Sequence, residues 1–288
     1  MFLIILSILL LLLLGFFMEC RRELRYFIVN KSAVGFSKLN MTDDMKVIIL
    51  SDLHSKVYGD DNDILLESIK NENPDIVLIA GDMLVGRVDE DHKHAVSFCT
   101  RLTNIAPVYY ALGNHEQRMK EDIDIYGERA FKDYKEKLVS AGVHFVENNH
   151  LDVNFKGQIV SIYGLELSMD TYKKFKKIVV TKEDVEKRIG KCDENRFNIL
   201  LAHNPSYMEA YKEWGADMIV SGHLHGGLIR LPFIGAVITP QMRLFPKYSG
   251  EITLEDGKCI IVSKGLGTHT FNIRFLNQAE VISLRIGK

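Results

Sequence analysis

The sequence lacks the features that mark several large classes of protein. Its 288 residues include only 6 prolines and 4 cysteines, and the cysteines form no CxxC pair. This spacing argues against a disulfide framework and against a zinc ribbon. The chain also contains no HExxH sequence of a zinc peptidase and no GxSxG sequence of a serine hydrolase. The 36 basic and 38 acidic residues nearly balance, so we expect no nucleic-acid partner.

One stretch near the N-terminus is long and apolar. Phe2 to Met18 contains no charged residue, and its length is at the lower end of the about 17–25 residues that span a bilayer. A cleaved signal peptide needs a basic start and a small-residue cleavage site, and lipid attachment at the following cysteine needs small residues before it. Both patterns are missing, so we expect an uncleaved transmembrane anchor helix over residues 1–20.

Basic residues flank only the C-terminal end of this apolar stretch, at Arg21, Arg22 and Arg25. By the tendency of positive residues to stay inside, we expect a single-pass protein of the cell membrane whose main part lies in the cytoplasm. Residues 21–44 are expected to be a juxtamembrane segment that leads into the fold. Residues 45–288 are expected to form one domain, because no linker, repeat or low-complexity tract interrupts them.

The expected domain alternates short apolar runs with polar segments of helical spacing, which is typical of an α/β fold. The runs are rich in Val, Ile and Leu and predict buried strands. These strands are Lys46–Leu50, Ile76–Ala80, Val108–Leu112, Ile159–Gly164, Ile199–Ala202, Met218–Val220, Ile260–Val262 and Val281–Ile286. Helices are predicted at Asp63–Asn71, Glu90–Leu102 and Tyr126–Ser140. The lysine-rich segment Lys173–Arg188 predicts a surface helix or cap, either as a solvated face or as a contact for an anionic substrate or lipid headgroup.

Polar clusters follow five of the predicted strands directly. They are Ser51-Asp52-Leu53-His54, Gly81-Asp82, Gly113-Asn114-His115-Glu116, His203-Asn204-Pro205 and Ser221-Gly222-His223-Leu224-His225-Gly226-Gly227. Because ligands of open α/β sheets bind beyond the carboxyl ends of the strands, we expect these clusters to meet at one rim. Each residue alone has another explanation, such as a helix cap, a turn or a core histidine. Their joint occurrence at five strand ends indicates a binding site.

The mixture of carboxylates and imidazoles is typical of a transition-metal site. Such ligands suit Mn, Fe, Zn or Ni ions better than they suit Ca²⁺ or Mg²⁺. The ligands outnumber what one tetrahedral ion can use, whereas two ions that share an aspartate would use them all. Pairs of this kind serve hydrolytic displacement at phosphorus. A P-loop is excluded, because the segment Gly81–Val88 lacks the Lys and the Ser/Thr of that motif.

The order of the motifs resembles that of the calcineurin-like metallophosphoesterase family. The resemblance rests on Asp52-x-His54, Gly81-Asp82, Gly113-Asn114-His115-Glu116, His203 and Gly222-His223-x-His225. One position departs from the pattern, because the second motif of the family usually continues to an aspartate where this chain has Val85. Further segments are similar to a membrane-anchored bacterial branch, the YkuE/YaeI-like phosphodiesterases. These segments are His223–Gly235, Ser263–Thr268 and Asn272–Phe275.

The resemblance implies a four-layer α/β/β/α sandwich that holds two divalent metal ions at its rim, with Mn²⁺ expected and Zn²⁺, Fe²⁺ or Ni²⁺ as alternatives. It implies one ion on Asp52, His54 and His225, a second ion on Asn114, His203 and His223, and Asp82 as the bridge between them. His115 matches the non-ligand histidine of the family, which stabilises the transition state or protonates the leaving oxygen. For substrate binding we expect His269 and Arg274 to contact the phosphate, although Arg274 could instead pair with Glu280.

The expected function is hydrolysis of a phosphodiester or pyrophosphate by metal-activated hydroxide. An anchored enzyme favours a lipid-linked or envelope-derived substrate, because tethering concentrates it at the bilayer. Some related bacterial enzymes cleave the pyrophosphate of a UDP-linked acylated glucosamine. Two alternatives stay open, namely a soluble nucleotide substrate and a catalytically silent metal-binding scaffold of the same fold. The scaffold is disfavoured because every ligand position and His115 are present. The sequence predicts no oligomeric state.

Overall fold

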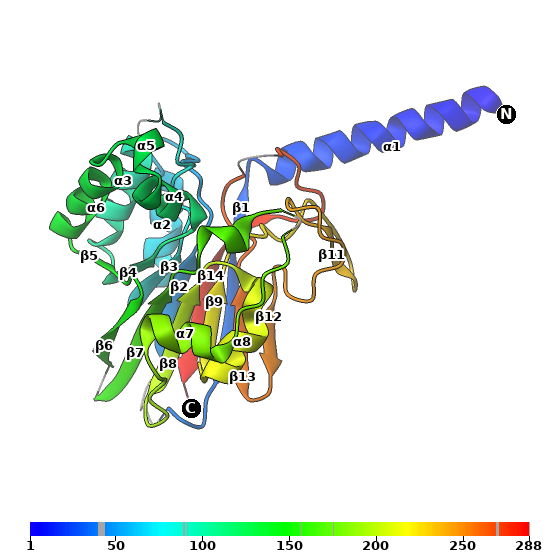
Figure 1. The fold of residues 1–288 in the computed structure, drawn as a ribbon. Helices are drawn as coiled ribbons and strands as arrows, with labels where there is room; N and C mark the ends of the chain where they lie inside the picture. The colour runs from blue at the N-terminus through cyan, green and yellow to red at the C-terminus, as the bar shows by residue number, and fades with distance from the viewer. Residues whose placement is uncertain are drawn as a thin grey trace.

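The computed structural model of the chain describes residues 1–39, 44–88, 90, 92–155, 157–174, 176–268 and 271–287. A long N-terminal helix, α1 (Phe2–Glu23), projects away from a domain of helices and sheets (Figure 1). This helix is long and apolar enough to cross a membrane, and its apolar window is not buried against the domain. The last turn of α1 differs, because Cys20 and Glu23 are buried.

The strands of the described residues form two six-stranded sheets and one small hairpin. The first sheet contains, in spatial order, β1 (Phe27–Gly35), β14 (Ala279–Gly287), β2 (Met45–Leu50), β3 (Ile76–Ala80), β4 (Val108–Ala111) and β5 (Val143–Phe145). The second contains β12 (Ile252–Glu255), β13 (Lys258–Val262), β9 (Met218–Ser221), β8 (Phe197–Ala202), β7 (Gln158–Leu165) and β6 (Asn149–Phe155). The hairpin is β10 (Ile229–Leu231) with β11 (Gly235–Ile238). Strands β2 to β5 pair in parallel, as do β7, β8, β9 and β13.

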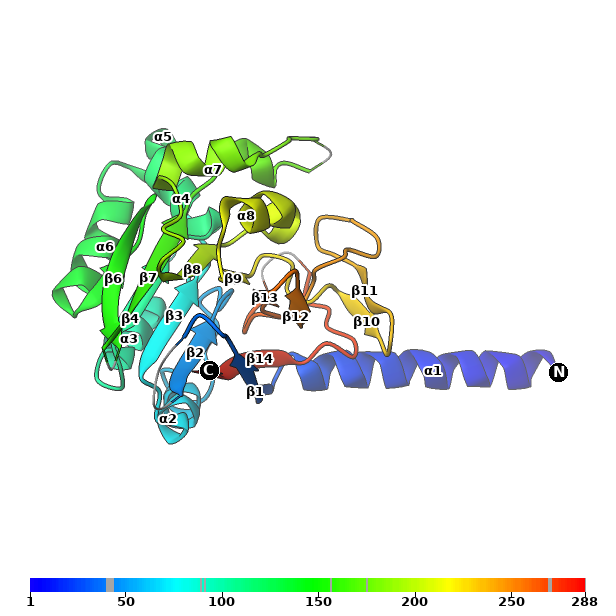
Figure 2. The ribbon, with the colours of Figure 1, turned by 90° about the horizontal axis from the view of Figure 1, so that it is seen from below.

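Helices cover the outer faces of both sheets (Figure 2). They are α2 (Asp63–Glu72), α3 (Lys93–Leu102), α4 (Asn114–Glu121), α5 (Ile123–Tyr126), α6 (Ala130–Ser140), α7 (Lys182–Ile189) and α8 (Met208–Trp214), with short 3₁₀ turns at Met169–Tyr172 and Pro205–Tyr207. Alternate residues of a strand point to opposite faces. Val47 and Ile49 of β2 therefore lie in the core between the sheets, whereas Ile48 and Leu50 pack in the core that α2, α3 and α6 cover. A third core lies between the second sheet and helices α7 and α8, which gives helix, sheet, sheet and helix layers.

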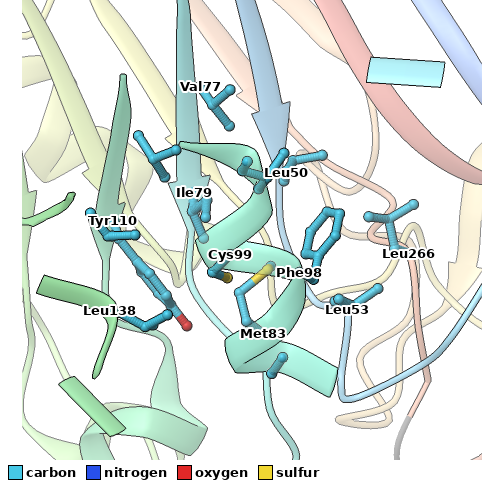
Figure 3. Packing of buried hydrophobic residues seen from close by; sticks show 14 of the residues in the cluster. Leu50, Leu53, Val77, Ile79, Met83, Phe98, Cys99, Tyr110, Leu138 and Leu266 are labelled. Atoms are coloured by element: carbon cyan, nitrogen blue, oxygen red, sulfur yellow. The ribbon is translucent and has the colours of Figure 1, made fainter. Parts of the chain in front are cut away.

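Figure 3 shows the core between the first sheet and its helices, where strand residues meet Phe98 and Cys99 of α3. Leu53 and Met83 also lie in this core, and both are fully buried although they belong to loops beyond the ends of β2 and β3. Each follows an aspartate expected at the metal site. Burial of these side chains therefore fixes the loops that carry Asp52 and Asp82 to the body of the domain.

All the strands that the sequence predicts are present, and their ends differ from the predicted ends by at most two residues. The predicted helices correspond to α2, α3 and α6, although α3 begins only at Lys93 and α6 only at Ala130. Residue 91 lies outside the described residues. Among the described residues of the lysine-rich segment, the helix is α7, where the Thr181 hydroxyl accepts a hydrogen bond from the Asp184 N–H and caps the helix. The lysines at positions 173, 174, 176 and 177 precede this helix and lie in a loop.

The segment expected to lead into the fold contains a strand of the first sheet. Strand β1 pairs in parallel with β14, from Phe27 opposite Ala279 to Gly35 opposite Gly287. Val34, Phe36 and Leu39 are buried in the core between the sheets. The fold therefore begins before residue 45. The sequence gives little sign of this, because β1 is half exposed and its partner is the last strand of the chain.

Deletion of residues 1–44 is expected to destabilise the domain strongly, whereas deletion of residues 1–19 keeps β1 and preserves the fold. The longer deletion removes three buried apolar side chains, each worth about 1.5–3 kcal/mol of burial free energy. Their sum is comparable to the whole free energy of unfolding of a typical domain, about 5–15 kcal/mol. Thermal unfolding followed by circular dichroism compares the two proteins, and equal midpoints would contradict a structural role for β1.

Candidate metal centre

The residues expected at the metal site come together at the carboxyl ends of strands from both sheets. Strands β2, β3 and β4 of the first sheet end at this rim, as do β8 and β9 of the second. The side chains that follow these strands are all buried, with at most 8% of any of them exposed. They are Asp52, His54, Asp82, Asn114, His115, His203, His223 and His225.

Three overlapping groups of metal-ligating atoms lie at this rim, and within each group all the atoms are within 4.8 Å of one another. The groups are Asp52, His54 and His225; His54, Asp82 and His115; and Asp82, His203 and His223. Asp82 belongs to two of them. Its Oδ2 atom lies 3.0 Å from His203 Nε2 and 3.8 Å from His54 Nε2, so this carboxylate links the two sides of the cluster.

Backbone carbonyl groups orient several of the imidazole rings. The Nδ1 atom of His203 is 2.6 Å from the carbonyl oxygen of Ala80, and that of His225 is 3.0 Å from the carbonyl oxygen of Gly267. A carbonyl oxygen only accepts hydrogen bonds, so each of these Nδ1 atoms carries the proton and donates it. Nε2 is then left to bind a metal ion, as is usual for metal-ligating histidines.

The environment of one buried amide oxygen, that of Asn114, indicates that the site suits a metal ion. Asn114 Oδ1 is buried and accepts no hydrogen bond from the described residues. An unsatisfied buried polar atom costs free energy, and a cation at this position would remove that cost. The surrounding imidazole nitrogens and carboxylate oxygens are the ligands that divalent transition metals prefer. The residues present therefore fit divalent ions.

Five of the expected ligands have a left-handed backbone conformation. The φ angles are 51° at Asp52, 50° at His54, 56° at Asp82, 70° at His223 and 52° at His225. This region costs a residue other than glycine of the order of 1–3 kcal/mol, and such strain concentrates at functional sites. Backbone hydrogen bonds hold the turns in place, since the Asp52 N–H donates to the Gly81 carbonyl and the His54 N–H to the Asp82 carbonyl. The left-handed turns therefore lower the stability of the domain, and they direct these five side chains into the cluster.

Glu116, at the end of the third motif, positions the loop of Asp82. Its buried carboxylate accepts hydrogen bonds from the N–H groups of Asp82, Met83 and Gly113, at 2.9, 2.7 and 3.0 Å. The Tyr110 hydroxyl donates to the same carboxylate at 2.7 Å. The Asp82 side chain is itself fixed, because its Oδ1 accepts the His115 N–H at 2.8 Å. The motif Gly113-Asn114-His115-Glu116 contains this residue, but nothing in the sequence indicates its positioning role.

Glycine is required at position 113 because the backbone there passes very close to the Asp82 carboxylate. A Cβ atom at this position would lie 2.1 Å from Asp82 Oδ1, which is far inside contact distance. Only glycine lets β4 end so close to the shared carboxylate. The glycine between β4 and α4 is therefore part of the geometry of the cluster.

The buried carboxylates of Asp52 and Asp82 favour the presence of positive charge in the cluster. Burial, together with the nearby Asp82, raises the pKa of Asp52 to about 6, although His203 acts in the opposite direction. Burial opposes a charge on His203, but Asp82 and Asp52 outweigh it and raise the pKa of His203 to about 10. A proton on His203 thus supplies positive charge to the two carboxylates. A metal ion held by these residues would supply the same charge in place of that proton.

Two residues that the sequence did not indicate lie against His223. Gln241 Nε2 is 3.2 Å from His223 Nε2, and the ring of Tyr172 meets the ring of His223 edge to face at 5.0 Å between centroids. Tyr172 belongs to a 3₁₀ turn before the lysine loop, and Gln241 follows the β10–β11 hairpin. Neither lies in a motif, so no signal in the sequence marks them.

His269 and Arg274 are the two residues expected to contact the substrate phosphate. His269 lies outside the described residues. Arg274 is 1% exposed, and its guanidinium donates to backbone carbonyls of the chain. The acceptors are the carbonyl oxygens of Lys264, Gly265, Gly267 and Asn277.

These contacts support a positioning role for Arg274, and its contact with the substrate phosphate stays a prediction. The carbonyl of Gly267 accepts hydrogen bonds from both Arg274 and His225 Nδ1, so Arg274 supports the loop that orients His225. Glu280, the alternative partner expected for Arg274, forms an ion pair with Lys264 at 2.9 Å. A buried arginine with carbonyl acceptors cannot be told from a substrate-binding arginine by sequence alone.

Comparisons with known proteins agree with the motifs. Residues 45–227 match the model of the calcineurin-like phosphoesterase family. The uncharacterized metallophosphoesterase YkuE of Bacillus subtilis is 26% identical over 245 residues, which cover 83% of this chain and 78% of YkuE. An uncharacterized metallophosphoesterase of Helicobacter pylori strain J99 is 30% identical over 266 residues, which cover 90% of this chain and 63% of that longer protein.

Among solved structures, the phosphopantetheinyl hydrolase PptH of Mycobacterium tuberculosis is similar to this chain at 15% identity, with a TM-score of 0.48 over 77% of this chain and 89% of PptH. This likeness is too distant to assign a substrate. The family match covers more than half of the chain and includes every motif at the metal centre. The chain therefore belongs to the calcineurin-like phosphoesterase family and is a metal-dependent phosphoester hydrolase.

Proposed function

We propose that this protein is a phosphodiesterase or pyrophosphatase that uses two divalent metal ions. The position of Asp82 carries the proposal, because its carboxylate belongs to two groups of ligands at once. A carboxylate of this kind bridges paired ions about 3.5–4 Å apart in hydrolases that act at phosphorus. The proposed ligands of one ion are Asp52, His54 and His225, and those of the other are Asn114, His203 and His223. Mn²⁺ is the proposed ion.

When bound, the metal ions supply Lewis-acid activation of water and neutralise charge on the phosphoryl oxygens. The proposed task of His115 is to donate a proton to the leaving oxygen. The contact between His115 Nδ1 and the carbonyl oxygen of Val85 supports this task, because it fixes the orientation of the ring, and Nε2 is the nitrogen that we propose carries the transferred proton. The His115 N–H also donates to Asp82, so the proton donor and the proposed bridge are held together.

A basic cavity beside the metal centre supports an anionic substrate. The cavity has a volume of about 370 Å³, and His223 forms part of its wall. Basic side chains line it at Lys173, Lys174, Lys176, Lys177 and Arg243. Lys173 and Lys176 each form an ion pair with Asp170. The remaining positive charge suits a substrate that carries negative charge beyond the phosphorus under attack.

Replacement of Lys174 and Lys177 by alanine is expected to raise KM for a diphosphate substrate with little change in kcat. Exposed charge pairs contribute about 0.2–1 kcal/mol each, so the pair predicts a loss of about 2- to 30-fold in kcat/KM. The matched control replaces Lys182 and Lys187 on α7 with alanine. Steady-state kinetics with bis(p-nitrophenyl) phosphate and a nucleoside diphosphate ester compares the variants. An equal loss with both substrates, or an equal loss in the control, would contradict a role for the cavity in binding extra negative charge.

We further propose that α1 is an uncleaved membrane anchor and that the substrate is lipid-linked or envelope-derived. The apolar character of α1 supports the anchor. The three arginines at its domain end (Arg21, Arg22 and Arg25) favour a catalytic domain in the cytoplasm. A C-terminal reporter that works in only one compartment tests this orientation. A soluble nucleotide is the alternative substrate, and a panel of lipid-linked and soluble pyrophosphates separates the two.

The experiment that tests the proposed chemistry measures hydrolysis of bis(p-nitrophenyl) phosphate by the full-length chain in detergent. Metal is removed with a chelator and restored as Mn²⁺, and bound metal is counted by elemental analysis. Two ions per chain together with metal-dependent hydrolysis would support the proposal. One ion per chain in the active protein would contradict the dinuclear centre. Two ions without hydrolysis of any phosphoester in the panel would instead favour the silent scaffold.

A further inference from the structure

The β10–β11 hairpin exposes large apolar side chains to an unusual degree. At its turn Phe233 is fully exposed and Ile234 is 59% exposed. The loop after β11 adds Leu244 at 64% and Phe245 at 60%. This loop folds back on β11, because Leu244 bridges to Ile238 and the Phe245 N–H donates to the Val237 carbonyl. The exposed side chains therefore belong to one small unit, and apolar surfaces of this kind mark interaction sites.

The hairpin lies beside the domain end of the apolar helix α1. Figures 1 and 2 show the hairpin next to the turns of α1 that are nearest the domain. The contact runs through Phe275, whose ring lies 4.9 Å from the ring of Phe16 of α1. Phe275 is also bonded to β10, since its N–H donates to the Leu228 carbonyl and its carbonyl accepts the Arg230 N–H. One segment thus packs on the helix and pairs with the hairpin.

The same segment reaches the metal centre. The Asn277 side chain donates to the backbone carbonyls of His225 and Gly227, which precede β10. The Asn277 N–H donates to the Glu23 carboxylate in the last turn of α1. The end of α1, the hairpin and the loop of the proposed ligand His225 are therefore joined by hydrogen bonds into one connected unit.

We propose that the hairpin surface, defined by Phe233, Ile234, Leu244 and Phe245, inserts into the lipid–water interface beside α1. The proposed occupant is the bilayer, because the surface continues from a helix whose apolar window is exposed and long enough to span a membrane. Aromatic and aliphatic side chains next to a spanning helix are typical of the interface region. This inference rests on the proposed function only in that it takes α1 to be an anchor.

A second contact with the bilayer restricts the orientation of the domain more than one helix alone does. A single helix lets the domain rotate and tilt about its end, whereas a second contact fixes the domain against the membrane surface. The loop of His225 is bonded to both contacts, so the metal centre is held at a set height above the lipid. A phosphoester in the headgroup region would then meet the metal centre in a defined orientation.

Depth-dependent quenching of tryptophan fluorescence tests the hairpin surface. The full-length chain is reconstituted into vesicles of phosphatidylethanolamine and phosphatidylglycerol, with and without bromine on the acyl chains. Single variants place a probe at Phe233→Trp or Leu244→Trp, and the native Trp214 is buried and gives the same background in each. We expect brominated lipid to reduce the added emission at both positions to about half or less, as for side chains at the interface.

Two matched variants make the outcome decisive. Phe17→Trp, on the exposed face of α1, reports whether the helix itself is in the bilayer. Val139→Trp is half exposed on α6, which lies far from α1 in Figures 1 and 2, and is expected to show no quenching. Quenching at Phe17→Trp without quenching at the hairpin would overturn the inference and leave the anchor intact. Quenching at neither would overturn the anchor, and equal quenching at Val139→Trp would remove the specificity. Blue-shifted hairpin emission without quenching would indicate a protein partner and would also overturn the inference.

Discussion

Asp82→Asn is expected to lower kcat for phosphodiester hydrolysis by about 1,000-fold, on the order of 4 kcal/mol of transition-state stabilisation. The reason is the position of this carboxylate, which belongs to two ligand groups and lies 3.0 Å from His203 Nε2. Asparagine keeps the size of the side chain and one oxygen, so the hydrogen bond from the His115 N–H is preserved. It removes the negative charge and the second oxygen that a bridge between two cations requires.

Metal content separates this effect from a loss of folding. The Asp82→Asn variant is expected to bind fewer than two ions per chain at metal concentrations that fill the parent protein. Its circular dichroism spectrum should be unchanged, because the hydrogen bonds from the Asp82 and Met83 N–H groups to Glu116 remain. The matched control is Asp133→Asn, which removes an exposed carboxylate on α6 that pairs with Arg129. A variant that keeps two ions and more than a tenth of the parent kcat would contradict the bridging role.

The sequence predicts the strands that carry the metal centre because they are buried on both faces. Strand β3 consists only of apolar residues, and β8 is apolar except at Asn198, so short runs of Val, Ile and Leu indicate both strands well. Strand β1 lacks this signal, since its alternating and half-exposed residues resemble a linker. Its place in the sheet depends on β14, and no local pattern reveals a partner at the other end of the chain.

The sequence indicates which residues meet at the metal centre. It indicates little about the backbone conformations and hydrogen bonds that hold them there. Parallel strands bring their carboxyl ends to one edge, so residues that follow β2, β3 and β4 must lie close together. The left-handed backbone of Asp52 and His54 has no such signal, because these residue types adopt that conformation only in a particular tertiary setting. The same is true of Glu116, whose acceptors are N–H groups brought to it by two different loops.

Arg274 illustrates a limit of reasoning from residue type. An arginine near a phosphoesterase motif predicts contact with a phosphate, because its guanidinium suits that group. In the fold it turns inward and donates to carbonyls in the loop of Gly267. The choice between these two roles depends on whether the loop leaves its carbonyl groups unpaired, and that depends on tertiary structure. The two glycines of Ser263–Thr268 are a hint in the sequence that such carbonyls need a donor from another segment.

His115→Gln is expected to lower kcat by about 100- to 1,000-fold while two metal ions per chain remain bound, as for the loss of a proton donor. The distinction matters because His115 lies close enough to His54 and Asp82 to be counted among the possible ligands. Its ring is held by the carbonyl of Val85 and packs edge to face on the ring of His54, with 4.9 Å between centroids. Glutamine keeps a hydrogen-bond donor but cannot give up a proton near neutral pH.

A comparison of two substrates with different leaving groups tests the role of His115 more directly than kcat for one substrate. A proton donor matters most when the leaving oxygen is basic, so the loss in the His115→Gln variant should be large for an alkyl phosphodiester and small for a p-nitrophenyl ester. His150→Asn, which replaces an exposed histidine of β6, is the matched control and should leave both rates unchanged. If the variant instead loses one metal ion and both substrates slow equally, His115 is a ligand. In that case the proton would have to come from another group at the rim.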